Sequence, residues 1–518
     1  MNYDIIIVGM GPVGATAANL AGQWGLRTLV VDKADSVYEN PRAMGFDHEV
    51  MRTFDGIGLA DAIQEYVVPY RPSRYMTTGG EVIKRIDAAK PPFSLGWAPN
   101  YVFTQPPVER ALRGNLERFG NVEVQLGCEV LSVGDAADGT SVRLRSGGGE
   151  ERIAKSRYVL ACDGGTSAVR SGLGLRMEDL DFDEPWLVVD VLLKEGAGAA
   201  LPDTNIQFCE TARPCTFVVG PGQHRRWEFM INEGETPADM ATPATIRSLI
   251  SRWLPDEDYD IWRASTYRFH ALVLREWRVG NIFLLGDAAH MTPPFLAQGM
   301  CQGIRDASNL IWKLALRIAG KAGDRLLDSY QQERLPHVRR TTEVAKEFGQ
   351  VICERNPAKA GERDARMLEE LRRNPEGIVR QGLIPGLQAG FMRGSAPAGE
   401  LFPQPMVTNS VGRTALLDNF VGTHFYLVVD ASKLTVDLTE LSQQLATVSV
   451  SIRLVCLMGK SPLGENDYQE ADAVLENWFA LRNCSAVLVR PDHYVYGVAD
   501  DIDGVFELLK DCVVQLRH

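Results

Sequence analysis

The fold is decided by the stretch Tyr3-Asp4-Ile5-Ile6-Ile7-Val8-Gly9-Met10-Gly11-Pro12-Val13-Gly14. Residues 3–8 are a dense apolar run, typical of a fully buried strand, and the glycines that follow have the spacing G-x-G-x-x-G. Gly9 allows a tight turn, Gly11 lets the backbone approach a pyrophosphate, and Gly14 permits close packing of a helix on the strand. Pro12 opens the helix expected over residues 12–24, whose positive N-terminal end suits phosphates.

A second apolar strand, residues 28–31, follows the predicted helix and ends at Asp32 and Lys33. Asp32 stands 18 residues after Gly14, where a carboxylate accepts hydrogen bonds from ribose hydroxyls. Strand, glycine turn, helix, strand and acid together predict a Rossmann unit that binds a dinucleotide. This pattern by itself does not separate FAD from NAD.

Composition narrows the class of protein. The chain has 518 residues, which at roughly 100–200 residues per domain predicts two to four domains. Its net charge of −13 disfavours nucleic acid and anionic membranes as partners. The nine cysteines are scattered without C-x-x-C or metal-ligand spacing, which favours reduced thiols in a cytoplasm and no metal site. No signal peptide and no transmembrane run of about 18 apolar residues is expected.

The remaining pattern predicts an α/β protein with an inserted antiparallel sheet. Strands are expected over residues 122–133 and 141–144, joined by a turn at 136–139, and shorter alternating strands follow between 179 and 266. Residues 304–318 have the spacing of a helix with one apolar face. The resulting division is 1–75, 104–178 and 270–345 for a discontinuous nucleotide-binding domain, 76–103 and 179–269 for a sheet domain, 346–395 for a helical linker, and 396–518 for a small α/β domain.

Two further motifs each follow a predicted strand. Gly286-Asp287-Ala288-Ala289-His290 places an acid where it can bind a ribityl or ribose hydroxyl, and His290 is expected to make a structural hydrogen bond. A loop stiffened by Pro293 and Pro294 follows, and then the helix that begins near Gly299 and Met300. The second motif, Cys162-Asp163-Gly164-Gly165, is an Asp-Gly turn that on its own is common in α/β proteins.

The three motifs, in this order, resemble those of the FAD-dependent aromatic hydroxylases of group A, the para-hydroxybenzoate hydroxylase family. A narrower resemblance, to the 3-(3-hydroxyphenyl)propionate hydroxylase branch, rests on Pro41-Arg42-Ala43, Arg225-Arg226-Trp227-Glu228-Phe229 and residues 293–314. Leu488-Val489-Arg490-Pro491-Asp492 looks like the thioredoxin-like tail of that branch. The resemblance implies a Rossmann-type FAD-binding domain, an inserted substrate-binding sheet and a thioredoxin-like C-terminal domain without thiol chemistry.

The resemblance also implies the cofactors and their contacts. NADH or NADPH would reduce FAD, and the reduced flavin would react with O2 to give a C4a-hydroperoxide that hydroxylates a small phenolic ring. Arg42 would lie near the flavin, and Gln105 and Arg113 would contact FAD. The residues expected to bind the cofactor are Gly9, Gly11, Pro12, Gly14, Asp32, Lys33, Arg42, Gln105, Arg113, Asp163, Gly164, Asp287, Pro294, Gly299 and Met300.

A phenol reacts faster as phenolate, so a base beside it is expected. The candidates are His48, six residues after Arg42, and Tyr267 and His270, which are three apart on one strand and cannot face the same side of it. Arg225 or Arg226 is a candidate for a substrate carboxylate, and Phe208 and Phe217 are candidates for the pocket wall.

Several alternatives stay open at this point. The same flavin chemistry on a hydroxypyridine, a quinolone or a polyketide phenol fits these motifs, and so does an FAD oxidoreductase that inserts no oxygen. A binding module without catalysis fits least. The tail is expected to support folding or a homodimer contact.

Overall fold

The computed structural model describes residues 2–87, 90–136, 139–434, 441, 444–445, 448–457 and 464–518. The Rossmann unit forms as the sequence predicts, with β1 (Tyr3–Val8), α1 (Pro12–Gln23) and β2 (Thr28–Val31). The central strand β1 pairs in parallel with both β2 and β11 (Glu151–Ala161). The sheet order is β17-β18-β11-β1-β2-β8, extended by β10 and β9. Its other strands are β8 (Val122–Gln125), β9 (Cys128–Ala136), β10 (Gly139–Ser146), β17 (Arg278–Val279) and β18 (Ile282–Leu284).

Two details of this sheet differ from expectation. The single strand predicted over residues 122–133 is two strands, because the chain turns at Gly127, which has a φ of +63°. The turn expected at 136–139 includes residues 137–138, which lie outside the described residues.

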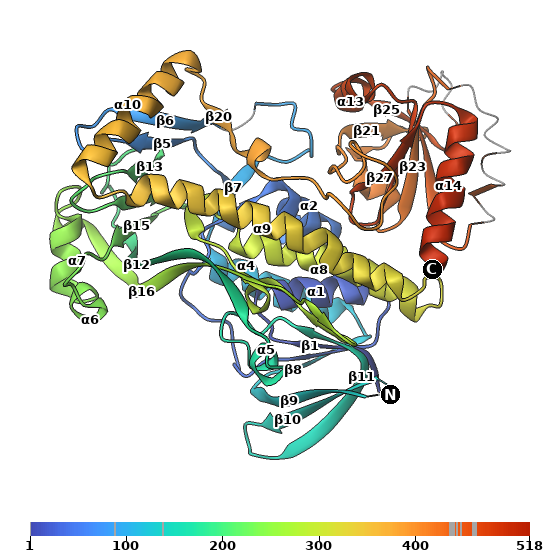
Figure 1. The fold of residues 1–518 in the computed structure, drawn as a ribbon, viewed down its shortest axis with the longest axis horizontal. Coiled ribbons are helices and arrows are strands. Elements are labelled where there is room, and N and C mark those ends of the chain that lie inside the picture. Colours follow the sequence, from blue (N-terminus) through green and yellow to red (C-terminus); the bar gives the residue numbers. More distant parts are fainter. Residues whose placement is uncertain are drawn as a thin grey trace.

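Helices α8 (Gly299–Ile318) and α9 (Arg325–Cys353) run side by side, and α1 packs against α8. Figure 1 shows α9 crossing the molecule from beside the C-terminal domain to α10 (Pro357–Arg373). The boundary expected between residues 345 and 346 therefore falls inside one continuous helix. The shorter helices of this part are α2 (His48–Gly56), α3 (Ala60–Ile63), α4 (Gln105–Gly114) and α5 (Ala168–Gly172).

The inserted sheet has the order β19-β16-β12-β15-β14-β13-β5-β6-β20 and is antiparallel from β19 to β13. Its outer face packs on α6 (Pro237–Met240) and α7 (Pro243–Ile250). Its inner face, which carries Trp186, packs on α9 at one end. The strands are β5 (Ser73–Met76), β6 (Val82–Asp87), β12 (Met177–Leu193), β13 (Asn205–Phe208), β14 (Cys215–Val219), β15 (His224–Met230), β16 (Tyr259–Leu274), β19 (His290–Met291) and β20 (Ile378–Val379).

The segment expected to join this sheet, residues 76–103, divides between two sheets. It supplies β6 here, whereas β7 (Asn100–Phe103) pairs with β3 (Gly45–Asp47) and β4 (Val67–Pro69) in a separate three-stranded sheet. That small sheet places β3 and the start of α2 against α8.

The C-terminal sheet has the order β22-β21-β25-β24-β23-β26-β27 and the thioredoxin-like arrangement of a parallel β23/β24 pair beside an antiparallel β26/β27 hairpin. Its core includes Trp312 and Leu316 of α8, so the domain packs firmly on the Rossmann part. The elements are β21 (Met406–Asn409), β22 (Thr414–Leu416), β23 (Phe425–Asp430), β24 (Ile452–Leu457), β25 (Asp467–Glu470), β26 (Ala486–Val489), β27 (Val495–Ala499), α11 (Asp418–Val421), α13 (Val474–Arg482) and α14 (Ile502–Arg517).

In the described part of the chain, none of the helices combines the length and apolarity that a membrane span requires.

Candidate active site

In the glycine turn between β1 and α1, one glycine has room for a side chain and two have none. A Cβ on Gly14 would lie 1.9 Å from the carbonyl oxygen of Gly9, and a Cβ on Gly9 would lie 2.5 Å from that of Cys162. A Cβ on Gly11 would have no atom within 4 Å. Gly9 and Gly14 are thus required for close packing, whereas Gly11 borders open space at the N-terminus of α1, where phosphates bind.

Asp32 holds the same turn from the end of β2. Its Oδ2 accepts a hydrogen bond from the backbone N–H of Met10 at 2.6 Å, and its Oδ1 accepts one from Ala34 at 2.8 Å. Lys33 beside it is exposed. The carboxylate is therefore fixed at the edge of the open space that borders Gly11, where ribose hydroxyls of a dinucleotide would lie.

A second wall of this site is built where β18 leads into α8. A Cβ on Gly303 would lie 2.4 Å from a methyl of Val13, so α8 and α1 touch through glycine. Asp287 is exposed beside this contact, and Pro294 lies in the short 3-10 turn (Pro294–Leu296) that precedes Gly299 and Met300. The free N–H groups at the start of α8 suit a partial negative charge on a ligand.

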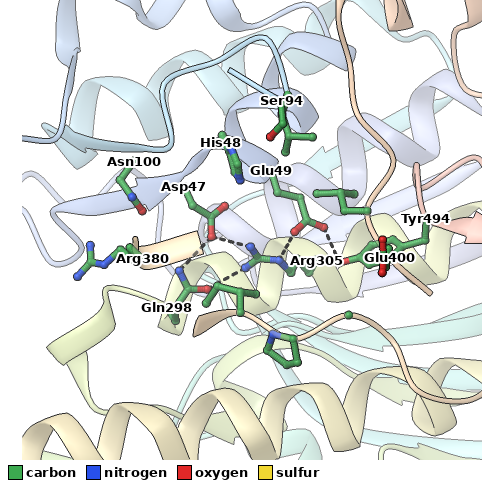
Figure 2. Close-up of a pocket in the computed structure, with 15 residues that line it drawn as sticks. Asp47, His48, Glu49, Ser94, Asn100, Gln298, Arg305, Arg380, Glu400 and Tyr494 are labelled. Carbon is green, nitrogen blue, oxygen red and sulfur yellow. Dashed lines mark hydrogen bonds and ion pairs between the residues drawn. The ribbon is translucent and has the colours of Figure 1, made fainter. Parts of the chain in front are cut away.

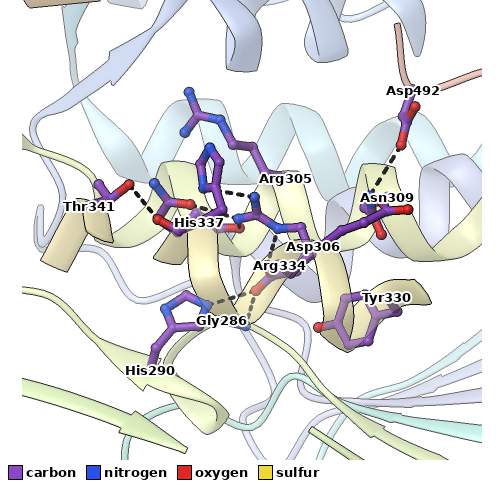
Figure 3. A network of polar contacts seen from close by, with 12 residues as sticks. Gly286, His290, Arg305, Asp306, Asn309, Tyr330, Arg334, His337, Thr341 and Asp492 are labelled. Carbon is purple, nitrogen blue, oxygen red and sulfur yellow. Dashed lines mark hydrogen bonds and ion pairs between the residues drawn. The ribbon is translucent and has the colours of Figure 1, made fainter. Parts of the chain in front are cut away.

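Figure 3 shows what holds this wall in place. Asp306, fully buried, accepts a hydrogen bond from the backbone N–H of Gly286 at 3.0 Å, and its carboxylate also lies 2.7 Å from His290 Nε2 and 2.8 Å from Arg334 Nε. The structural hydrogen bond expected of His290 is confirmed.

Several residues expected to bind the cofactor have buried hydrogen-bonding atoms that no protein group uses, or fix a loop in place. Arg113 Nη2 donates a hydrogen bond to Glu109. Its Nε and Nη1 have no hydrogen-bond partner, although both atoms are buried. Oδ1 of Asp163 is also buried without a partner. Gln105 Oε1 accepts hydrogen bonds from the backbone N–H groups of Arg42 and Ala43, which fixes the loop that carries the exposed Arg42 side chain. Buried polar atoms without partners are rare, so these donors and acceptors fit a polar ligand such as FAD.

The other side of this loop is fixed by a charged cluster on the inner face of the inserted sheet. Asp190, fully buried, accepts hydrogen bonds from Arg226 at 2.7 and 3.0 Å, and His224 Nε2 lies 2.8 Å from it. Arg226 donates to the carbonyl of Arg42 at 2.8 Å, and Arg263 donates to that of Pro41 at 2.7 Å. Arg226, expected to meet a substrate carboxylate, instead has Asp190 and the loop as partners.

The other predicted substrate residues contact neighbouring parts of the inserted sheet and its outer core. Arg225 is half-exposed and donates to the carbonyls of Gly222 and His224. Phe217 and Phe208 are on the outer face, in the core that α7 covers, where Phe217 packs on Trp227 and Phe208 on Trp253. The strand alternation of β13 and β14 explains this, because the inner-face positions are the neighbouring residues.

Tyr267 and His270 face opposite sides of β16, as their spacing predicts. Tyr267 lies opposite Trp186 on the inner face, with the guanidinium of Arg263 5.1 Å from its ring. His270 lies opposite Asp183, with Nδ1 3.1 Å from its carboxylate. His270 is therefore on the outer face of the inserted sheet.

A cavity of about 260 Å³ lies where α2, the start of α8, the linker and the C-terminal domain meet (Figure 2). Arg305 of α8 spans one wall by ion pairs to Asp47 and Glu49, and it donates to Gln298 at 2.9 Å. The lining residues are Asp47, His48, Glu49, Ser94, Leu95, Asn100, Gln298, Arg305, Arg380, Ile384, Pro385, Gly386, Glu400, Leu401 and Tyr494.

His48 lines this cavity at the first position of α2. Burial lowers the pKa of His48 to about 4, with further lowering by Arg305 and Arg52, while Asp47 opposes the shift. The imidazole is thus neutral near pH 7 and able to accept a proton. Arg305 and Arg380, the two arginines that line the cavity, are absent from the residues that the sequence patterns single out.

Comparison with known proteins places these features in a family. The family model described as FAD binding domain matches residues 2–345, and that described as HcaD C-terminal domain matches residues 399–511. A probable NADH-specific resorcinol 4-hydroxylase of Rhodococcus jostii (strain RHA1) is 35% identical, over 98% of this chain and 94% of its own length. A 3-(3-hydroxy-phenyl)propionate/3-hydroxycinnamic acid hydroxylase of Escherichia coli (strain K12) is 32% identical, over 96% and 92%.

Solved structures with the same fold include the flavin-dependent monooxygenase PieE in complex with FAD and substrate, at a TM-score of 0.82 and 20% identity over 99% of both chains. Another is aklavinone-11 hydroxylase with FAD and aklavinone, at a TM-score of 0.79 and 21% identity, over 99% of this chain and 98% of that one. These confirm the predicted arrangement of a Rossmann part, an inserted sheet and a C-terminal domain.

Proposed function

The chain belongs to the family of FAD-dependent aromatic hydroxylases, and from this premise we propose that it hydroxylates a single phenolic ring held in the cavity beside His48. The observation that carries the proposal is the position of this neutral imidazole in a cavity whose wall includes Gln298, the residue just before the N-terminus of α8.

The residues of the two walls would hold FAD between them. Gly11 and the start of α1 would bind the diphosphate, Asp32 would bind ribose hydroxyls, and Arg113, Asp163 and the loop at Arg42 would border the remainder. FAD would supply hydride acceptance from NADH or NADPH and activation of O2. The protein contributes position and the exclusion of water.

His48 is proposed to accept the proton of the substrate hydroxyl, which raises the electron density of the ring. Tyr267 remains a candidate for a supporting contact, because it lies on the inner face. The substrates for which these relatives are named, resorcinol and 3-(3-hydroxy-phenyl)propionate, support a small phenol, and the NADH specificity in the name of one of them supports NADH as the reductant. A homodimer and a cytoplasmic location stay predictions, as do the roles of the individual site residues and the domain boundaries.

Replacing His48 with Gln is expected to lower kcat/KM by about 10²-fold or more, the usual contribution of a positioned base. In the wild type the His48 pKa, lowered from 6.5 to about 4, keeps the base neutral at higher pH. Protonation should therefore reduce kcat/KM only as the pH falls through about 4, and the variant should lack this dependence. A pH profile of kcat/KM on wild type, His48→Gln and His270→Gln checks this; an equal loss in the His270 variant would contradict the assignment.

The proposal as a whole is tested with the FAD-loaded enzyme by a panel of phenols. At least one phenol should accelerate NADH or NADPH oxidation and give a hydroxylated product with little hydrogen peroxide. If none of the panel accelerates the oxidation, the proposed substrate class is wrong.

A further inference from the structure

Arg380 is a buried cation for which the described part of the chain provides no carboxylate partner. It begins the 3-10 turn Arg380–Leu383, only 7% of its surface is exposed, and it lines the cavity. Its guanidinium lies 4.9 Å from the centroid of the Tyr70 ring, and its Nε is buried without a hydrogen-bond partner. Among the residues that the structure describes, no carboxylate lies within ion-pair distance of it.

The other charges around the cavity are compensated. Arg305 faces two carboxylates, Asp47 and Glu49, and Tyr494 donates a hydrogen bond to Glu49 at 2.9 Å. Glu400 pairs with Arg482 at 2.6 Å. Arg380 is therefore the one cation in the described lining that lacks a counter-ion.

Moving a guanidinium out of water without an anion to pair with it costs free energy. The guanidinium also presents a planar fork of N–H donors whose geometry matches an oxyanion. We infer that Arg380 binds an oxyanion of the aromatic substrate, either a side-chain carboxylate or a second ring oxygen. This inference rests on the proposed function, because it takes the cavity as the place where the ring binds.

The dimensions of the cavity agree with such a ligand. Its volume of about 260 Å³ is slightly below the range of roughly 300–1,000 Å³ for small-molecule sites, which suits one ring with a short substituent. His48 and Arg380 both line it, so a ring can offer a hydroxyl to the imidazole and an oxyanion to the guanidinium.

Binding to the FAD-loaded enzyme tests the inference without turnover. Three ligands are titrated against wild type, Arg380→Met and Arg380→Lys, by calorimetry or by the change in flavin absorbance: 3-(3-hydroxyphenyl)propionate, its neutral amide and resorcinol. Arg366→Met, an exposed arginine on α10, is the matched control. We expect Arg380→Met to weaken binding of the anionic ligand by about 10- to 100-fold, Arg380→Lys to restore part of it, and the control to match wild type.

The three ligands separate the two sources of the oxyanion. If Arg380 binds a side-chain carboxylate, only the propionate loses affinity in Arg380→Met, and its amide binds wild type and variant equally. If Arg380 binds a second ring oxygen, resorcinol loses affinity in Arg380→Met as well. Its binding to wild type then strengthens as the pH rises toward the pKa of its hydroxyls. Equal binding of all three ligands to wild type and Arg380→Met would overturn the inference.

Thermal unfolding without a ligand separates a binding role from a structural one. Because Arg380 has no counter-ion, Arg380→Met should unfold at the wild-type temperature or above it, while losing the stabilisation that the propionate or resorcinol gives to wild type. A lower unfolding temperature with unchanged ligand stabilisation would assign Arg380 a structural role and overturn the inference. A variant that binds phenols like wild type and still hydroxylates them would leave the proposed function standing.

Discussion

Replacing Gly14 with alanine is expected to give a protein that retains no FAD. The added Cβ would lie 1.9 Å from the Gly9 carbonyl oxygen, a backbone atom that cannot move without opening the turn between β1 and α1. Such overpacking costs about 1–3 kcal/mol, and here it displaces the N–H groups that face the diphosphate. The measurement is the flavin absorbance of the purified variant, together with its free energy of unfolding.

Gly11→Ala is the matched control, because it adds the same methyl group to another glycine of the same turn. Its Cβ meets no protein atom within 4 Å, and Gly11 has an ordinary extended backbone with a φ of −67°. This variant should fold with wild-type stability but bind FAD more weakly, since the methyl group enters the space that the phosphates need. A Gly11→Ala variant with unchanged FAD affinity would contradict this placement of the cofactor.

Replacing Arg490 with methionine should remove the C-terminal domain from its native position. Arg490 is fully buried and donates to Glu333 of α9 at 2.7 Å and to Asp492 at 2.6 Å. Burial by itself would raise the pKa of Glu333, but Arg490 and then Lys313 hold it at about 2, so Glu333 is ionised. Loss of Arg490 leaves these carboxylates undercompensated in the interior, at a cost of about 3–5 kcal/mol.

This cost is checked by the free energies of unfolding of wild type and Arg490→Met, measured by urea unfolding with tryptophan fluorescence. Lys510→Met removes the exposed pair of Lys510 with Glu507 on α14 and should change stability by less than about 1 kcal/mol. A loss of the same small size in Arg490→Met would show that the two parts associate without this network.

Local sequence pattern predicted the Rossmann unit closely, because each element there is fixed by neighbouring residues. The apolar run at residues 3–8 and the glycines that follow it define β1 and the turn, and Asp32 ends β2 as expected. The spacing of Tyr267 and His270 also predicted that they point to opposite faces.

The side of the sheet that each residue faces was less predictable. Phe208 and Phe217 were plausible wall residues, yet strand register places them on the outer face with α7. Register depends on which strands pair, and the pairing of β13 with β5, 132 positions away in the chain, has no local signal.

The buried charge networks were missed for the same reason. Arg490 and Glu333 are 157 residues apart, and Arg52 and Asp418 are 366 apart. Each alone reads as a surface charge. The C-terminal domain, expected to support folding or dimer contacts, also supplies Glu400, Leu401 and Tyr494 to the cavity wall, which only the folded chain brings together.

Oxygen labelling tests the central claim most directly. The purified protein, loaded with FAD and supplied with NADH, is given the phenol that most accelerates NADH oxidation, under ¹⁸O2. The account predicts a hydroxylated product that is heavier than its substrate by one atom of ¹⁸O. A product without the label, or oxidation of NADH with the phenol unchanged and hydrogen peroxide in equal amount for every phenol, would contradict it.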